Sequence, residues 1–309
     1  MYHGIINVYK EAGYTSHDVV ARLRGICKQK KIGHTGTLDP DAVGVLPVCL
    51  GNGTKLCDLL ADRTKEYIAV LRLGIVTDTQ DMSGMVLSRN NAEVDQEQVK
   101  QVIASFQGEQ QQIPPMYSAL KVNGKKLYEL AREGKEIERK PRPVTVYEIE
   151  VIKETHPEYT IRVNCSKGTY IRTLCHDIGQ RLGCGGAMAS LSRTRVGEFQ
   201  IDQAYTLDQL QSLAEKGQLS QVVIPVEKMF ENIPGVYVKE GSFKALKNGN
   251  QLKSGELQLK ESAAGSDLDI IKDGQEVRVY DHRGIFYGIY SYRRQYRLFS
   301  PVKLFIPEM

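Results

Sequence analysis

The sequence changes character near Pro234, and this change limits the folds that are open to the chain. Before Pro234, helical and strand patterns are mixed without a regular strand–helix–strand alternation, which predicts an α+β fold. After it, strand patterns separated by turns predict a small β module, with strands at residues 277–280, 285–292 and 302–306. The 309 residues allow two domains at about 150 residues each. We therefore predict one domain over residues 1–232 and a second over residues 235–309.

The first domain contains recognisable helix starts and strand patterns. Capping residues precede apolar residues at the helical period in three places, at Ser16, Asp95 and Thr206. Strands are expected at residues 66–73, 144–155 and 159–165. The last two form a predicted hairpin, and a helix that contains Arg172 follows it.

Two segments of the first domain have no regular pattern. Residues 33–53 are rich in glycine, and Asp39 precedes Pro40, which favours an extended backbone at Asp39. We predict a loop there that holds its side chains in fixed positions. The polar, basic segment 114–143 begins and ends with proline-containing sequence and is predicted to be a mobile arm outside the main sheet.

The sequence gives no support for a membrane, metal or cofactor site. Its longest apolar stretch, residues 43–50, is far shorter than the roughly 20 residues that cross a bilayer. The six cysteines form no C-x-x-C pair and no cluster at zinc spacing. The glycine-rich motifs that bind dinucleotides or phosphates are incomplete or missing. Residues 1–10 lack the pattern of a secretory signal, so we expect a cytoplasmic protein that needs no metal and no cofactor.

Charge is distributed unevenly along the chain. The net charge is only +4, from 41 Lys and Arg against 37 Asp and Glu. Residues 19–38 nevertheless carry five basic and no acidic residues, and residues 121–142 carry eight basic against four acidic residues. A third basic stretch, residues 278–303, also contains several tyrosines. These stretches favour a polyanion as partner, although solvated surface faces would produce the same pattern.

One acid and one arginine stand out as candidates for chemistry. Asp39 is a single acid within the loop, and Arg172 lies in the first turn of its predicted helix. A cation is disfavoured there by the helix dipole, so a buried carboxylate would compensate it. Exposure of Arg172 to solvent would also resolve the conflict.

Several motifs, in this order along the chain, resemble the TruB-type tRNA pseudouridine-55 synthases. They read GHTGTLDP at residues 33–40, GVLP at 44–47, KEY at 65–67, TDT at 77–79, PMYSALK at 115–121 and CSKGTYIRT at 165–173. The resemblance extends from residue 4 to about residue 200. The tail from Gly235 resembles, less strongly, the PUA module, which is an RNA-binding β fold. The resemblance implies a pseudouridine synthase fold with a mixed, largely antiparallel sheet, plus a small C-terminal PUA-like β domain.

The resemblance also implies the reaction. Such enzymes break the bond between N1 of uracil and C1′ of the ribose, rotate the base, and rejoin it through C5, without a cofactor. Glycosidases need two carboxylates, because one protonates a poor leaving group and the other supplies the nucleophile or activates water. Uracil leaves as a delocalised anion and no water enters, so one carboxylate suffices.

Site residues follow from the matched motifs. Asp39 matches the catalytic carboxylate, acting as a nucleophile on the sugar or as a base at C2′, and Arg172 would pair with it. Tyr67 matches the catalytic tyrosine that stacks on the target base, and two roles stay open for it: to assist removal of the C5 proton, or only to position the base, since a phenol with a pKa of about 10 is a poor base. The expected substrate-binding residues match an N-terminal lysine with a structural or phosphate-contacting role, the histidine that fills the space of the flipped nucleotide, and two residues that line the uracil pocket: Lys10, His34, Tyr170 and Leu191.

The implied partner is the T-arm of tRNA, gripped by the arm at residues 114–143 and by the C-terminal module, mainly through shape and phosphates. We expect a monomer that needs no protein partner. Two alternatives remain open: an RNA-binding or tRNA-folding protein with secondary catalysis, and a pseudouridine synthase for another RNA.

Overall fold

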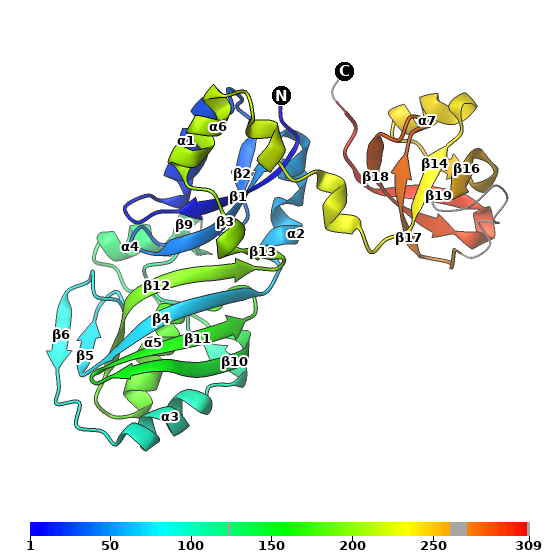
Figure 1. Cartoon of the computed structure of the whole chain (residues 1–309). Coiled ribbons are helices and arrows are strands. Elements are labelled where there is room, and N and C mark those ends of the chain that lie inside the picture. The colour runs from blue at the N-terminus through cyan, green and yellow to red at the C-terminus, as the bar shows by residue number, and fades with distance from the viewer. Residues whose placement is uncertain (123, 260–270, 308–309) are drawn as a thin grey trace.

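The computed structural model describes residues 1–122, 124–259 and 271–307. It contains a larger body around a nine-stranded sheet and a smaller body around a six-stranded sheet (Figure 1). A linker with two short 3₁₀ turns, Leu219–Val222 and Val226–Phe230, joins them. The arrangement confirms the predicted α+β fold with a small C-terminal β module.

The large sheet is mixed and mainly antiparallel, as predicted. Its main strand order is β1 (Gly4–Lys10), β3 (Val43–Leu50), β12 (Gly186–Val196), β4 (Lys65–Leu73), β11 (Glu158–Cys165), β10 (Arg142–Thr155) and β7 (Gly108–Gln112). Only β12 and β3 run parallel, over two residue pairs. Two short strands, β2 (Ile32–His34) and β13 (Phe199–Gln200), pair antiparallel with β3 and β12, respectively.

Helices build a core at each end of this sheet. Helices α3 (Gln96–Ala104) and α5 (Ile171–Arg181) pack their apolar residues on strands β4, β10 and β11. Helices α1 (Ser16–Ile26) and α6 (Leu207–Glu215) lie side by side and pack on β1 and β3 (Figure 1). A short helix, α2 (Cys57–Ala61), follows the 3₁₀ turn Gly51–Leu56. The sheet is thus covered by one apolar core at each end.

The helix caps were predicted well, with one correction. Asp95 and Thr206 each accept a hydrogen bond from the backbone three residues on, as caps do. Ser16, however, is the first residue of α1, and the cap is Thr15, whose side chain accepts from the Asp18 amide while Asp18 bonds back to the Thr15 backbone. The reciprocal pair with Asp18 selects Thr15 over Ser16.

The prediction of a loop over residues 33–53 is wrong for most of its length. Strand β3 fills Val43–Leu50, and only residues 35–42 are irregular. The strand is buried along almost its whole length, so it lacks the alternation of a half-exposed strand. Gly44 has a φ of +110°, and a Cβ there would lie 2.2 Å from the Arg193 carbonyl oxygen. Glycine therefore permits the close approach of β3 to β12.

The arm at residues 114–143 was predicted to be irregular and to lie outside the main sheet; it contains short elements of its own, and its last two residues, Arg142 and Pro143, belong to β10 of that sheet. Strands β8 (Lys121–Val122) and β9 (Lys125–Lys126) pair only with each other, and helix α4 (Leu127–Arg132) follows them. A second two-stranded sheet, β5 (Ile75–Thr77) with β6 (Val86–Arg89), projects from the same side of the larger body as α4 in Figure 1. The turn between β5 and β6 reaches the site described below.

The smaller body has more elements than the sequence indicated. Its sheet order is β15 (Leu252–Lys253), β19 (Leu298–Leu304), β18 (Phe286–Arg293), β17 (Glu276–Tyr280), β14 (Gly235–Val238) and β16 (Leu257–Leu259). The predicted strands at 277–280 and 285–292 correspond to β17 and β18. The third lies earlier than predicted, and helix α7 (Phe243–Lys247) was missed because it is only five residues long. Within the described ranges, no helix is long and apolar enough to cross a membrane.

The end of the chain packs back on the larger body. The Asn52 side-chain amide and the Lys55 ammonium, both in the larger body, donate to the carbonyls of Ile306 and Leu304, each at 2.7 Å. Phe305 contributes to an apolar cluster that also holds buried residues of β1 and β3. The two bodies therefore share a packed interface.

Candidate active site

Side chains of Lys10 and Ser16 hold the irregular segment 35–42 through hydrogen bonds to its backbone. The Lys10 ammonium donates to the carbonyls of Pro40, at 2.9 Å, and of Glu11, at 3.0 Å. The Ser16 hydroxyl, at the start of α1, accepts a hydrogen bond from the Leu38 amide at 3.0 Å. These bonds hold the backbone on both sides of Asp39, so its carboxylate is carried by a fixed support.

Arg172 contacts both carboxylate oxygens of Asp39, through one hydrogen bond and one ion-pair contact. Its Nε lies 3.1 Å from Oδ2 of Asp39, and its Nη2 lies 3.3 Å from Oδ1. The Arg172 side chain is only 7% exposed, whereas Asp39 keeps 37% of its side-chain surface. Exposure of Arg172 to solvent is thus ruled out, and the carboxylate compensates the guanidinium in the first turn of α5, where the helix dipole disfavours a cation.

Arg172 has three further acceptors. Its Nη2 donates to the Tyr117 carbonyl at 2.8 Å, and its Nη1 lies 3.4 Å from both the Thr79 carbonyl and Oδ2 of Asp81. The arm, the β5–β6 turn and the irregular segment 35–42 therefore all contact the Arg172 guanidinium. An arginine held by several acceptors in this way keeps its carboxylate partner in one geometry.

The environment of Asp39 raises the pKa of its carboxyl group. Burial raises the pKa of Asp39 above its usual value, the Arg172 guanidinium opposes this rise, and the Asp81 carboxylate adds to it. Asp39 is therefore a better nucleophile or base than a free carboxylate, and Arg172 still favours its ionised form.

Asp81 was not predicted from the sequence. It lies in the turn between β5 and β6, where its Oδ1 accepts from the Thr79 hydroxyl at 2.7 Å and from the Ser83 amide at 3.0 Å. The TDT motif at residues 77–79 pointed to this turn but not to Asp81. Its contact with Arg172 spans 91 residues, which no local pattern encodes.

Tyr67 lies in β4 directly opposite Arg193 in β12. Its side chain is buried, and burial raises the pKa of the phenol, while the charge of Arg193 and its hydrogen bonding oppose the rise. Because the net direction is upward, the phenol is a weaker acid than free tyrosine, and phenolate is less available as a base. This favours a positioning role. Arg193 is a second buried group that sequence reasoning missed.

The expected uracil-pocket residues lie on two elements near this centre. Leu191 is two residues before Arg193 on β12 and pairs with Ala69 of β4, so Leu191 and Tyr67 share one face of the sheet. Tyr170 precedes α5, and its backbone amide and carbonyl both bond to the Gln112 side chain, at 2.8 and 3.0 Å. Both side chains are half-buried.

His34 and Lys10 occupy different environments. The ring of His34, at the end of β2, lies 5.3 Å from the His17 ring, edge to face, and burial with the neighbouring His17 lowers its pKa. Lys10 is fully buried, and burial lowers its pKa to about 8. Its ammonium is bonded to backbone carbonyls, so the structure places Lys10 as a support of the segment 35–42 rather than as a surface contact for phosphate.

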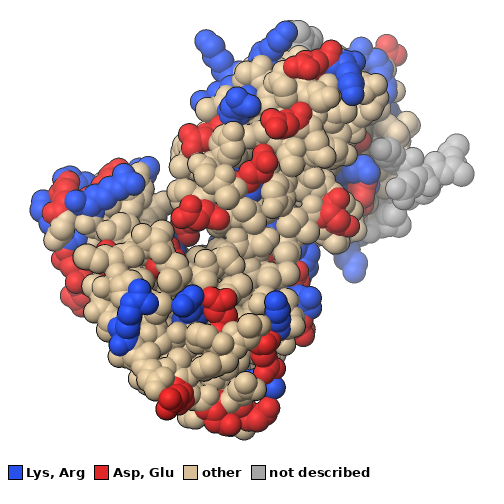
Figure 2. All heavy atoms as spheres, turned by 60° about the vertical axis from the view of Figure 1, so that its left-hand side comes forward, with Lys and Arg blue, Asp and Glu red and all other residues tan. Residues whose placement is uncertain are grey.

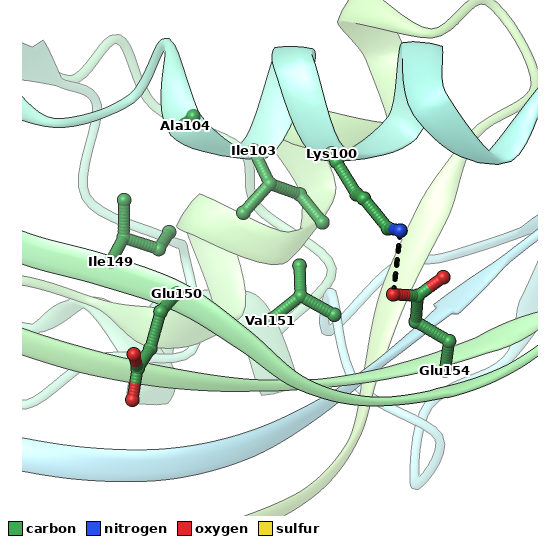
Figure 3. A pocket seen from close by; sticks show the side chains of 7 residues that line it. All are labelled: Lys100, Ile103, Ala104, Ile149, Glu150, Val151 and Glu154. Atoms are coloured by element: carbon green, nitrogen blue, oxygen red, sulfur yellow. Dashed lines mark ion pairs between the residues drawn. The ribbon is translucent and has the colours of Figure 1, made fainter.

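The described residues offer no metal site, and the cavity between α3 and β10 lies apart from Asp39. In the described part of the chain, no group of three His, Cys, Asp or Glu side chains could hold a metal ion. A cavity of about 350 Å³ lies between α3 and β10, with Ile103, Ile149 and Val151 along it (Figure 3). Lys100 and Glu154 form an ion pair of 2.9 Å at one end. None of its lining residues belongs to the Asp39–Arg172 site.

Known proteins resemble this chain in both sequence and fold. A protein from Lachnoclostridium phytofermentans named tRNA pseudouridine synthase B is 52% identical over 98% of this chain and 100% of its own length. A protein of the same name from Alkaliphilus oremlandii is 45% identical over 90% of this chain and 89% of its own. A structure titled as a Cbf5-Nop10-Gar1 complex has a chain with a TM-score of 0.69 and 30% identity, covering 99% of this chain and 85% of that one.

The fold and these relatives define the chain as a pseudouridine synthase, an isomerase that acts on RNA. Its more particular place follows from two family models. The model of the TruB family pseudouridylate synthase N-terminal domain matches residues 24–171, and that of the tRNA pseudouridylate synthase B C-terminal domain matches residues 172–231. The chain belongs to the TruB family.

Proposed function

We propose that this chain converts uridine 55 in the T-loop of tRNA to pseudouridine, with Asp39 as the catalytic carboxylate. The observation that carries the proposal is the ion pair between Asp39 and Arg172, in which the carboxylate stays partly exposed and the guanidinium is buried. The curated relatives, named tRNA pseudouridine synthase B, supply the substrate class.

The reaction needs one ionised carboxylate. Asp39 attacks C1′ of the ribose, or removes the C2′ proton, as the bond from C1′ to N1 breaks and uracil becomes an anion. The base then rotates and C5 bonds to C1′, as the Asp39–C1′ bond breaks in the first version or as Asp39 returns the proton to C2′ in the second. The C5 hydrogen is lost while N1 gains a proton, so the product is an isomer of the substrate. Arg172 keeps Asp39 ionised and oriented in both versions. No cofactor or metal takes part.

Other residues hold the flipped nucleotide. Chemistry at C1′ and C5 requires the uridine to leave the loop stack. The Tyr67 ring stacks on the uracil, Leu191 and Tyr170 line the pocket, and His34 fills the space that the nucleotide leaves. Their placement on β4, β12, the start of α5 and the end of β2 supports this assignment.

The tRNA is gripped outside the site by the arm at residues 114–143 and by a PUA-like domain over residues 235–309, with the catalytic domain over residues 1–232. On the face in Figure 2, basic side chains occur in separate groups with acidic neighbours rather than as one patch. In the arm, Glu133 pairs with Lys125 and Lys135, and Arg139 pairs with Glu136. We infer that Lys121, Arg132 and Lys140, which are exposed and form no ion pair within the described chain, contact phosphate. The chain acts as a cytoplasmic monomer without a protein partner.

Replacing Asp39 by Asn tests the proposal. We expect tritium release from tRNA labelled at C5 of uridine to fall below detection, while tRNA binding persists, because Asn keeps the shape but can be neither nucleophile nor base. Asp41→Asn is the matched control: Asp41 lies exposed on the same segment and should retain activity. An active Asp39→Asn variant would refute the assignment.

The match to a chain of the Cbf5-Nop10-Gar1 complex raises a second candidate, a synthase that needs other components or another RNA. Assay of the purified chain alone on a tRNA transcript separates the two. Turnover without added protein or RNA supports the stand-alone enzyme. Binding without turnover would contradict the stand-alone enzyme and favour a synthase that needs other components or an RNA-folding protein.

A further inference from the structure

Arg193 is a buried cation without an acidic partner. It is 2% exposed and is the largest of the fully buried side chains. Its Nε donates to the Val45 carbonyl at 2.7 Å, and its Nη2 has no hydrogen-bond partner. Among the described residues, no carboxylate forms an ion pair with it. A buried charge in this state is costly, so its retention calls for an explanation.

Its neighbours add to that cost. Arg193 lies close enough to Lys10, Lys65 and His34 for its charge to lower the pKa of each. All three are basic groups, so their charges would repel the guanidinium. A neutral donor would satisfy the Val45 carbonyl equally well, and the positive charge is not needed to hold β3 to β12.

The position of Arg193 relates two parts of the candidate site. Arg193 stands opposite Tyr67 in the β4–β12 register. Its Nη1 lies 3.7 Å from the point that a Cβ on Gly36 would occupy, so the guanidinium also reaches the segment that carries Asp39. Arg193 thus lies between the phenol of Tyr67 and the backbone before Asp39.

We propose that Arg193 is a positioning residue for the isomerisation, acting through the Tyr67 hydroxyl to hold that ring at a fixed place relative to the Asp39 segment. This inference rests on the proposed function. Stacking by Tyr67 and attack by Asp39 must act on the base and the sugar of one nucleotide, so their separation must be fixed. An error of about 1 Å in such an arrangement can cost about 100-fold in rate.

A double-mutant cycle tests the proposal on the full chain with tRNA. Arg193→Met is expected to lower kcat by about 10- to 100-fold with little change in KM, and Arg193→Lys to restore part of the loss. In a Tyr67→Phe background, which lacks the hydroxyl, Arg193→Met should cost less than about threefold, because the interaction has already been removed. A merely structural role would cost the same in both backgrounds.

Arg195→Met is the matched control. Arg195 lies two residues further along β12, pairs with Glu66 at 3.5 Å, and is partly exposed. We expect it to leave kcat unchanged. The proposal is overturned if Arg193→Met keeps kcat within about threefold of wild type, if the loss is equal in both backgrounds, or if Arg193→Met and Arg193→Lys both lose the folded state. A wild-type chain that makes no pseudouridine would instead overturn the proposed function.

Discussion

At the scale of single residues, the site is one guanidinium between two carboxylates. Arg172 bonds to Asp39 and Asp81, which come from segments that are far apart in sequence. The pairing of Asp39 with Arg172 could be anticipated, because the motifs resemble a family and because a cation at a helix start needs compensation. Asp81 and Arg193 could not, since their contacts span 91 and 148 residues and neither has a local signal.

The charge of Asp81 is expected to contribute to the pH dependence of the proposed reaction. Burial is the main cause of the raised pKa of Asp39, and the Asp81 carboxylate raises it further. The reaction needs ionised Asp39, so kcat/KM falls as pH drops through that pKa. Asp81→Asn removes a negative charge and lowers the pKa, and the acid limb of the kcat/KM profile is expected to move to lower pH.

Asp78→Asn provides the control for this pH profile. Asp78 lies in the same turn, is exposed, and accepts a hydrogen bond from the Met85 amide at 2.7 Å. Its replacement should leave the acid limb in place. A limb that moves to higher pH in Asp81→Asn, or that moves equally in both variants, would contradict the electrostatic account.

At the scale of elements, capping residues predicted helices and alternating apolar residues predicted strands. Strand β3, which is buried along almost its whole length, was not predicted. Helices α3 and α6 begin at their expected caps, and β10 with β11 forms the expected hairpin. Strand β3 was mistaken for a loop because Gly44 and Pro47 interrupt it. Its identity depends on packing against β12, which becomes visible only in the folded chain.

Gly44→Ala is expected to destabilise this element strongly. Alanine is strained at a φ of +110°, and its Cβ would meet the Arg193 carbonyl oxygen at 2.2 Å. The free energy of unfolding should fall by more than about 3 kcal/mol, measured by urea denaturation. Gly13→Ala has a similar φ of +85° but open space, and should cost only about 1 kcal/mol. Equal losses would show that the β3–β12 contact is not critical.

At the scale of the whole molecule, the change of pattern near Pro234 falls between the two sheets, the first of which ends at Gln200 while the second starts at Gly235. Their interface was not predictable. The Asn52–Ile306 bond spans 254 residues, and the rings of Phe230, Phe286 and Phe305, from three separate parts of the chain, meet there. No part of this cluster is marked by a local pattern.

Salt dependence tests how the whole molecule meets tRNA. Binding should weaken with salt because phosphate contacts release counterions. Replacing both Lys121 and Lys140 of the arm by Gln should reduce the slope of log Kd against log salt by about 1.5. The same change at Lys153 and Lys216, exposed residues outside the arm, should leave it unaltered. Equal slopes in the two double variants would remove the arm from the interface.

Carbodiimide mapping of pseudouridine in a tRNA transcript treated with the purified chain alone is the most direct test of the central claim. The account predicts one modified uridine, at position 55 of the T-loop, formed without cofactor, guide RNA or partner and missing after treatment with Asp39→Asn. An unmodified T-loop, or modification only at another position, would contradict it.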